Sequence, residues 1–347
     1  GNPTSSSMSI EFPYRDERIN DPKLIDEAYI ESKVNEGIRV IVQFVKPPAS
    51  DSILERLNTL CRKFGSNFEI RFFGFYGDTF DGRLLRRIPD VKALSVDCLT
   101  RAINSSEITN LRSLEELSIG VYELKELEIL SSENFFSLKA LSVSETRSSA
   151  LNLNYLRHYR ELKSLYICGH TKNIEAIGEL SGLEQLGLSS IKKTNLDFVN
   201  RLKELKDLSI ILGGRDNINE IAENNIENLE IIWVRGFNEF ANISRFKSLK
   251  KLRIEGQIKL ERLEFDNDMP FLNTVSVFNC KSLRTINGLI NLSALNDLRL
   301  GMIAIDFDEF AAQPMPKSLK KLAIYTGKEK KNRDIRSKLD KMGFSEF

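Results

Sequence analysis

Histidine and cysteine are the side chains best suited to nucleophilic catalysis or metal binding near neutral pH, and this sequence contains few of either. Its 347 residues include two histidines and four cysteines, which are His158, His170, Cys61, Cys98, Cys168 and Cys280. The cysteines form no CxxC pair and no cluster with the spacing of a zinc or redox site. We therefore expect four free thiols and neither a metal site nor a cofactor.

Other patterns that could bind phosphate or activate a nucleophile are incomplete. Gly213-Gly214 lacks the Lys-Ser or Lys-Thr pair that follows in a phosphate-binding loop. Acidic residues are numerous, but pairs such as Glu115 and Glu116 occupy positions where solvated charge is the default. The sequence therefore predicts a protein without enzymatic activity.

The elements that position these side chains come from a repeated motif. The pattern L-x-x-L-x-L, in which L stands for an aliphatic residue, occurs eleven times with starts 20 to 24 residues apart. One copy is Leu114-Glu-Glu-Leu117-Ser-Ile119. The first positions of the eleven copies are Val91, Leu114, Leu138, Leu162, Leu183, Leu205, Leu229, Leu249, Leu272, Leu295 and Leu319.

Each copy predicts one short strand, because its fourth and sixth positions alternate and therefore point to the same side. The remaining residues form a return arm. Apolar residues at every third position of the arm, such as Ile177, Leu180 and Leu183, favour 3₁₀ turns. One copy cannot bury its apolar stripe alone, so the copies are expected to stack.

This pattern resembles the short, 22-residue repeats of the leucine-rich-repeat superfamily, of the internalin-like and phosphatase-regulator-like kind. The resemblance covers residues 91–327 and implies an α/β solenoid, shaped as an arc or horseshoe, with a parallel β-sheet on its concave face. The family usually has asparagine at the ninth position, whereas this chain has residues such as His170, Gln257 and Cys280 there. We expect His170 to satisfy backbone groups of the turn rather than to act as a base or ligand.

The sequence predicts four segments. Residues 1–7 resemble residues left from an expression tag ahead of Met8, and residues 8–90 are expected to form an N-terminal α/β cap. Residues 91–327 form the repeat array, and residues 328–347 form a C-terminal capping helix. The N-terminal segment could alternatively be a separate binding module.

Both caps have an expected internal structure. Strands over Ile38–Val45 and Phe68–Phe75 should flank a helix that ends near Phe64, with a short helix over Asp81–Ile88 after them. A degenerate copy of the motif is expected at Ile70, Phe73 and Phe75. The inner face of the C-terminal helix is expected to contain Ile335, Leu339 and Met342.

Charge and hydropathy limit the classes of partner. The sequence has 50 basic and 49 acidic residues, so no global field attracts nucleic acid or anionic lipid, and neither is expected as a partner. No apolar run approaches the 18 residues of a membrane span. With Met8 as the native start no signal peptide precedes the chain, which predicts a cytoplasmic protein.

The third, fifth and seventh positions of each copy should face outward from the sheet. They are small in the N-terminal copies, and large ones begin at the sixth copy. The candidate partner-binding residues are Ile211, Ile231, Trp233, Arg235, Lys251, Arg253, Glu255, Phe278 and Arg299. Arg253 should lie beside Trp233, the only tryptophan, and close to Arg235. Exposed tryptophan, phenylalanine and arginine together are typical of protein interfaces.

We therefore predict a non-catalytic module that binds a partner protein on the concave face, for example an inhibitor or an immunity protein for a co-encoded toxin. A regulatory or targeting subunit of an enzyme such as a phosphatase is the alternative, and RNA binding through the arginine and aromatic residues is a third hypothesis. The large outward residues could instead pack on one another or form a homodimer contact, although a monomer is expected.

Overall fold

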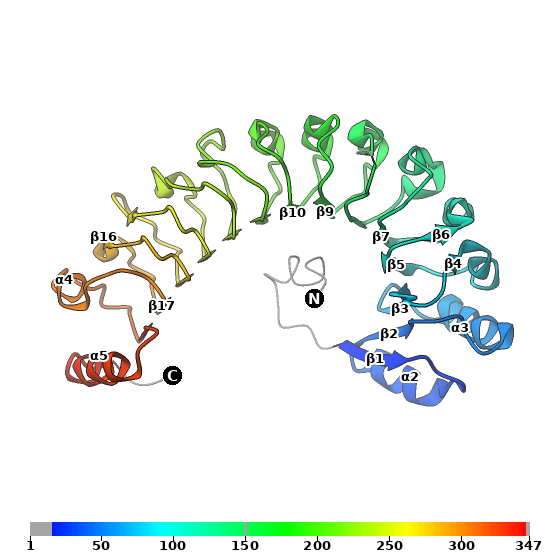
Figure 1. Cartoon of the computed structure of the whole chain (residues 1–347), viewed down its shortest axis with the longest axis horizontal. Coiled ribbons are helices and arrows are strands. Elements are labelled where there is room, and N and C mark those ends of the chain that lie inside the picture. Colours follow the sequence, from blue (N-terminus) through cyan, green and yellow to red (C-terminus); the bar gives the residue numbers. More distant parts are fainter. Residues whose placement is uncertain (1–15, 149–150, 345–347) are drawn as a thin grey trace. The chain divides into compact units, whose positions relative to one another are not determined.

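The computed structural model describes residues 16–148 and 151–344. The chain divides into two compact units, residues 1–183 and residues 184–347, which we call the N-terminal unit and the C-terminal unit. Within each unit, parallel strands line one side, and 3₁₀ segments, short helices and loops lie on the other (Figure 1). None of the described helices is long and apolar enough to cross a membrane.

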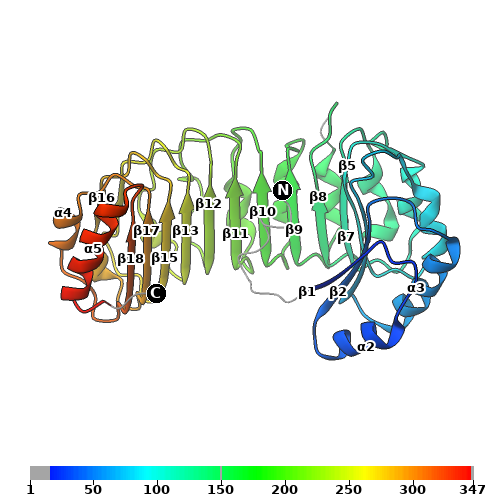
Figure 2. The same ribbon diagram turned by 60° about the horizontal axis from the view of Figure 1, so that its bottom comes forward.

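The N-terminal unit contains a parallel sheet whose described strands are neighbours in chain order (Figure 2). They are β1 (Asp16–Asn20), β2 (Arg39–Phe44), β3 (Phe68–Phe73), β5 (Ala93–Leu99), β7 (Glu116–Val121), β8 (Ala140–Val143) and β9 (Ser164–Cys168). The short strands β4 (Phe80–Asp81) and β6 (Ala102–Ile103) pair separately. The helices and 3₁₀ segments are α2 (Glu27–Asn35), α3 (Asp51–Lys63), η2 (Gly82–Arg87), η3 (Ser105–Asn110), η4 (Ile129–Ser131), η5 (Glu133–Phe135), η6 (Leu153–His158) and η7 (Ile174–Glu179).

The strand–helix–strand arrangement predicted near the N-terminus is present, because β2 and β3 pair in parallel and α3 connects them. The apolar stripe of α3 is buried, with Leu54, Leu57 and Leu60 at most 3% exposed. The short helix predicted after β3 is the 3₁₀ segment η2. β1 and α2 precede this arrangement and were not predicted.

The register predicted for β3 was wrong by three residues. The predicted copy has Phe73 at the fourth position and Phe75 at the sixth, but Ile70 lies opposite Leu94 and Phe72 lies opposite Val96. Phe72 is fully buried, whereas Phe73 points outward. The motif has its last two aliphatic residues two positions apart, and here Ile70 and Phe72 are those two residues.

The C-terminal unit contains a second run of parallel strands in chain order. They are β10 (Gln185–Ser189), β11 (Asp207–Ile211), β12 (Asn228–Ile232), β13 (Lys251–Glu255), β15 (Thr274–Phe278), β17 (Asp297–Gly301) and β18 (Lys321–Tyr325). On the return side, β14 (Arg262–Glu264) pairs with β16 (Thr285–Asn287). The helices and 3₁₀ segments are η8 (Asp197–Arg201), η9 (Ile243–Arg245), η10 (Leu289–Asn291), α4 (Phe307–Ala311) and α5 (Glu329–Lys341).

The aliphatic positions of the motif stack from strand to strand and form the core of this unit. The fourth positions lie in register and are at most 2% exposed: Leu186, Leu208, Leu229, Leu252, Val275, Leu298 and Leu322. The eleven predicted copies thus correspond to eleven described strands, four in the N-terminal unit and seven in the C-terminal unit. The predicted 3₁₀ turns of the return arms are also present, as in η7 and η10.

One copy has a register different from the predicted one. β12 pairs Leu229 with Leu208 and Ile231 with Ile210, so the motif begins at Ile226 rather than at Leu229. Ile226, Leu229 and Ile231 are at most 1% exposed. Residues after Ile231 therefore lie three positions further along the repeat than the sequence pattern predicted.

The ninth positions satisfy turn backbone without an asparagine ladder. The Nδ1 atom of His170 accepts a hydrogen bond from the backbone N–H of Leu151 (2.9 Å), so Nε2 carries the proton and donates to the Ser144 carbonyl (2.8 Å). Gln257 donates through Nε2 to the carbonyl of Ile231 (3.3 Å) in the neighbouring strand. His170 thus satisfies backbone groups of the turn, as predicted, and burial lowers the pKa of this imidazole.

The C-terminal helix packs through fewer residues than predicted. Ile335 and Leu339 of α5 are buried, at 3% and 1% exposed, and the helix contacts β18. Met342 lies after the last helical residue, Lys341, and is 39% exposed. The prediction that Met342 belongs to the inner face was wrong, because the helix ends before it.

Candidate functional site

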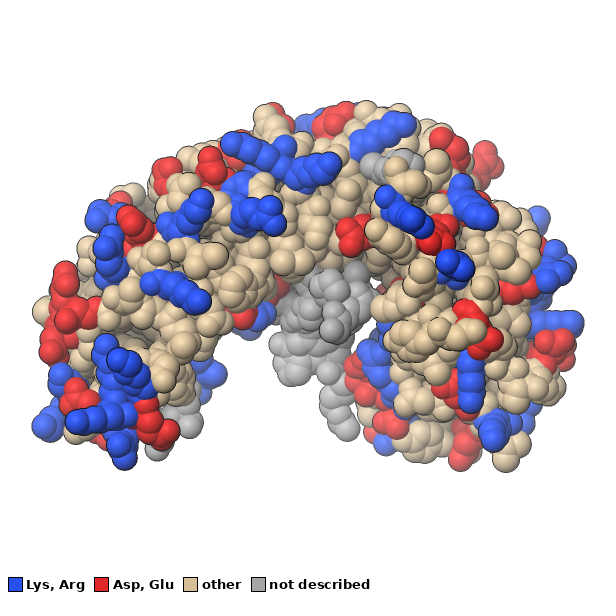
Figure 3. All heavy atoms as spheres, in the orientation of Figure 1, with Lys and Arg blue, Asp and Glu red and all other residues tan. Residues whose placement is uncertain are grey.

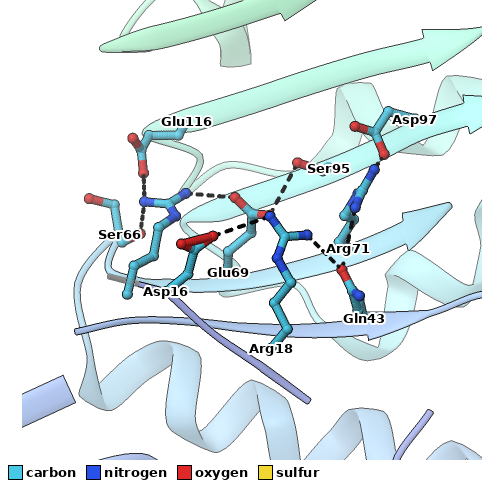
Figure 4. A network of polar contacts seen from close by, with 10 residues as sticks. Asp16, Arg18, Gln43, Ser66, Glu69, Arg71, Ser95, Asp97 and Glu116 are labelled. Carbon is cyan, nitrogen blue, oxygen red and sulfur yellow. Dashed lines mark hydrogen bonds and ion pairs between the residues drawn. The ribbon is translucent and has the colours of Figure 1, made fainter. Parts of the chain in front are cut away.

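The third, fifth and seventh positions of the repeats form the face of each sheet that does not pack on the core, which we call the open face. In the N-terminal unit this face carries a network of ion pairs across neighbouring strands (Figure 4). Arg39 forms ion pairs with Glu69 (2.6 Å) and Glu116 (3.0 Å), and Arg71 pairs with Asp97 (2.8 Å).

The arginines of this network use their donors on groups of the same surface. Arg71 also donates to the side-chain oxygen of Gln43 (3.3 Å), which accepts from Arg18 as well (3.1 Å). Burial raises the pKa of Asp97, although the adjacent Arg71 guanidinium opposes this. A partner would have to separate these half-buried pairs to use either member, so the network is better suited to fixing strands β1 to β7 than to binding.

The open face of the C-terminal unit has a smaller polar cluster at its centre. Glu230 accepts a hydrogen bond from the Ser209 hydroxyl (2.9 Å) and forms an ion pair with Arg253 (2.9 Å), which also pairs with Glu255 (2.8 Å). Burial raises the pKa of Glu230, while the Ser209 hydroxyl and Arg253 favour its charged form. Two carboxylates thus hold one half-exposed guanidinium in place.

Beyond the last residue of strands β10 to β17 in the large sheet of the C-terminal unit, one residue turns the chain away from the sheet with a positive φ. These residues are Ser190, Leu212, Trp233, Gly256, Asn279 and Met302, with φ between 48° and 74°. Each donates its N–H to the last strand residue of the next repeat, as Trp233 does to the Glu255 carbonyl (2.7 Å). Glycine and asparagine adopt this conformation readily, whereas bulky side chains do so at a cost of about 1 kcal/mol.

Three of these turn residues are large, apolar and exposed. Leu212 is 41% exposed, Trp233 44% and Met302 46%. Tyr325, the last residue of β18, is 49% exposed. We call these four residues the rim, because they lie at the C-terminal ends of strands β11, β12, β17 and β18.

Two aromatic rings of this region lie on glycines of the next repeat. A Cβ atom on Gly256 would lie 2.1 Å from Cδ2 of Trp233, so the indole covers the glycine directly. In the same way, a Cβ on Gly301 would lie 2.5 Å from the ring of Phe278. The alternative that large side chains pack on their neighbours therefore holds for one side of Trp233, and its other side remains exposed.

The structure brings six of the nine predicted binding residues onto the open face of the C-terminal unit. They are Ile211, Lys251, Arg253, Glu255, Phe278 and Arg299. The other three were placed wrongly because of the register of β12. Ile231 faces the core and is fully buried, while Trp233 and Arg235 lie beyond the end of the strand. Arg253 lies opposite Glu230 and not beside Trp233 as expected.

Leu212, Met302 and Tyr325 were not predicted from the sequence. Leu212 and Met302 occupy the eighth position of their repeats, and Trp233 occupies the same position once its motif begins at Ile226. A search for large apolar residues at the eighth position would have found Leu212 and Met302, because only the third, fifth and seventh positions had been considered. Tyr325 is at the seventh position of its repeat and was not selected.

The remaining candidates for chemistry lie apart from this surface. Among residues 16–148 and 151–344, no group of three or more His, Cys, Asp or Glu side chains could hold a metal ion. The four cysteines are free thiols, of which three are buried and Cys98 is exposed. Burial raises the pKa of Cys61 to about 12 and that of Cys280 to about 11, so both thiols stay protonated at neutral pH.

No protein-family model and no curated protein matches the sequence. Among solved structures, the chain is similar to an internalin from Listeria monocytogenes, with 16% identity, a TM-score of 0.42, and coverage of 91% of this chain and 82% of that one. It is similar to a leucine-rich-repeat protein from Leptospira interrogans, with 16% identity, a TM-score of 0.38, and coverage of 85% and 98%.

A third similar structure is the Toll–Spätzle complex of Drosophila, with 13% identity and a TM-score of 0.45. The likeness covers 92% of this chain and 53% of that one. The fold is established by the chain itself: the motif recurs, each copy forms one parallel strand, and the strands stack in register. Both units therefore have the leucine-rich-repeat fold.

Proposed function

We propose that the C-terminal unit binds a partner protein through its rim and the adjoining open face, without catalysis. The observation that carries this proposal is the combination of exposure and backbone conformation at Leu212, Trp233 and Met302. Each could be replaced by glycine or asparagine with less backbone strain and less exposed apolar surface. Strained residues retained against folding preference often belong to functional sites.

The neighbouring open face supplies polar contacts of fixed geometry. Arg253 is held by two carboxylates, yet its side chain is 48% exposed and keeps N–H groups for a partner. Exposed tryptophan and arginine side chains are enriched in protein interface hot spots, and the rim and the adjoining open face supply both. Rigid placement also reduces the entropy that is lost on binding.

The specific form that we propose is an inhibitor, such as an immunity protein, that acts by covering the surface of its partner. A regulatory or targeting subunit of an enzyme is the alternative. The two differ in their effect on the captured partner. An inhibitor abolishes its activity at stoichiometric concentration, whereas a targeting subunit leaves turnover of a small substrate intact.

The proposal is tested by differential capture. Native lysate is passed over the parent protein, a Trp233→Ser/Met302→Ser variant, and an Ile290→Ser control. Ile290 lies in η10 on the return side and is 49% exposed, so the control removes an equally exposed apolar side chain from another surface. We expect a protein that the parent and control retain and the rim variant loses.

Calorimetric titration of that protein should then show at least about tenfold weaker binding to Trp233→Ala, in line with a hot-spot loss of about 2 kcal/mol or more. Retention by all three baits, followed by equal affinities, would place the site elsewhere on the chain.

A further inference from the structure

The charges of this chain are segregated, although their sum is close to zero. Residues 317–344 contain ten basic and three acidic residues, whereas the other 319 residues contain 40 basic and 46 acidic residues. The basic segment comprises β18, α5 and the turn before β18. Figure 3 shows lysine and arginine side chains gathered over this part of the C-terminal unit.

Most of these cations have no ion pair among the described residues. Two basic residues of α5 are paired, Arg336 with Asp340 and Lys338 with Asp308 and Asp334. Six of the remaining basic residues lie in the turn before β18 and in the N-terminal half of α5 or at its N-cap, and are exposed with no ion pair within the described part of the chain. We call them the basic band: Lys317, Lys320, Lys328, Lys330, Lys331 and Arg333.

The distribution of the band along α5 opposes folding preference. Lys330 and Lys331 lie in the first turn of the helix, after Lys328 at its N-cap. Positive charge is unfavourable there, because the helix dipole is positive at its N-terminus. Local preference and charge repulsion both argue against three lysines at this place, so a role outside folding explains them better.

We propose that the basic band binds the phosphodiester backbone of a nucleic acid, independently of base sequence. Lysine is a common donor to phosphate oxygens, and such contacts need no apolar anchor. Protein interfaces, in contrast, are depleted in lysine and have an apolar core. Insertion into a lipid surface needs an exposed apolar helix face, and Ile335 and Leu339 of α5 are buried against the unit instead.

Salt dependence gives a quantitative test on the full chain. A fluorescein-labelled DNA duplex of about 20 base pairs is titrated by anisotropy between about 50 and 200 mM salt, a range over which phosphate contacts change the affinity measurably. If all six cations of the band contact phosphates, the logarithm of the binding constant should fall with the logarithm of the salt concentration with a slope of magnitude about 5. The variant Lys330→Glu/Lys331→Glu should reduce that magnitude by about 1.8 and weaken binding at least about tenfold at the low-salt end of the titration.

The matched control is Lys259→Glu/Lys281→Glu, which makes the same charge change at two exposed positions outside the band. It should leave binding within about twofold of the parent, because it removes no phosphate contact. The band variant should melt no lower than the parent, because glutamate in the first helical turn suits the dipole. Its loss of binding therefore cannot be attributed to unfolding.

Three results would overturn the proposal. One is no binding of the duplex at about 50 mM salt, the most favourable condition of the titration. Another is equal loss of binding in the band variant and the control. The third is tighter binding to polyglutamate or to vesicles containing phosphatidylserine than to the duplex, which would assign the band to an acidic protein or to a membrane surface.

Discussion

The stacking of Trp233 on Gly256 makes a sharp prediction about how two substitutions combine. Gly256 has φ = 74°, so an alanine there is strained by about 1 kcal/mol regardless of its neighbours. Its Cβ would also lie 2.1 Å from the indole, which must then move off the surface that it covers. Gly256→Ala is therefore expected to lose both the backbone preference and the indole contact.

The size of the second loss follows from the burial of the indole. Trp233 is 44% exposed, so roughly half of its surface is covered. Half of the roughly 150–250 Å² that a large aromatic side chain can bury, at about 25 cal/mol per Å², corresponds to about 2 to 3 kcal/mol as an upper estimate. Gly256→Ala should thus destabilise the parent by about 2 to 3 kcal/mol, because displacement of the ring is partial, but destabilise Trp233→Ala by only about 1 kcal/mol.

The double-mutant cycle requires four proteins, and urea unfolding is followed by far-UV circular dichroism since the Trp233→Ala variants lack the only tryptophan. Gly214→Ala is the control, because a Cβ there has its nearest neighbour at 3.7 Å and the residue has no positive φ. It should be nearly neutral and additive with Trp233→Ala. If Gly256→Ala instead costs the same free energy in both backgrounds, the indole does not lie on Gly256 and β12 does not pair Leu229 with Leu208.

Two further predictions concern groups that titrate or react. Burial lowers the pKa of His170, so at acidic pH the unfolded chain binds a proton that the folded chain does not, and the free energy of unfolding should fall as the pH drops below about 6.5. His170→Gln can keep both hydrogen bonds and should remove that part of the pH dependence in urea titrations. An unchanged pH profile in this variant would contradict the assignment. A disulfide-exchange reagent should label one thiol rapidly in the native protein, Cys98, and four in denaturant, whereas rapid native labelling of two or more would mean that a thiol described as buried is accessible.

The repeat itself could be predicted from the sequence because it is over-determined. Eleven copies of one spacing give the strand, the direction of its inward side chains and the length of the return arm at once, and the copies support one another. β1 and α2 have no such support. Their apolar residues are few, and they follow no period that the rest of the chain repeats.

The error at β12 has a physical origin in the motif. Both Ile226-Glu-Asn-Leu229-Glu-Ile231 and Leu229-Glu-Ile-Ile232-Trp-Val234 fit the pattern, and Val234 is also buried because the ninth position packs into the turn. A shift of three residues exchanges the two faces of a strand, since side chains alternate. Only the neighbouring strands decide between the two frames, by pairing Leu229 with Leu208 and Leu252.

That exchange of faces changed the candidate site more than the fold. The fold requires only that each strand has aliphatic side chains facing the core, and both registers satisfy this requirement. The site depends on which residue is outside, so Ile231 was lost from it and Trp233 moved from the strand to the turn. Solenoid surfaces are therefore best predicted after the register of every copy has been fixed against both neighbours.

Net charge is a weak guide to the partners of a repeat protein for a related reason. A total of +1 excludes a strong field only when the charges are mixed, and a solenoid extends its chain so that segments distant in sequence do not screen one another. The Debye length in physiological salt is about 8 Å, so acidic residues several repeats away do not cancel the positive potential around the cations of α5. Charge in a repeat protein should therefore be counted repeat by repeat. Counted that way, the basic band is a proposed site in addition to the apolar rim, and substitutions at Trp233 and at Lys330 should affect different partners.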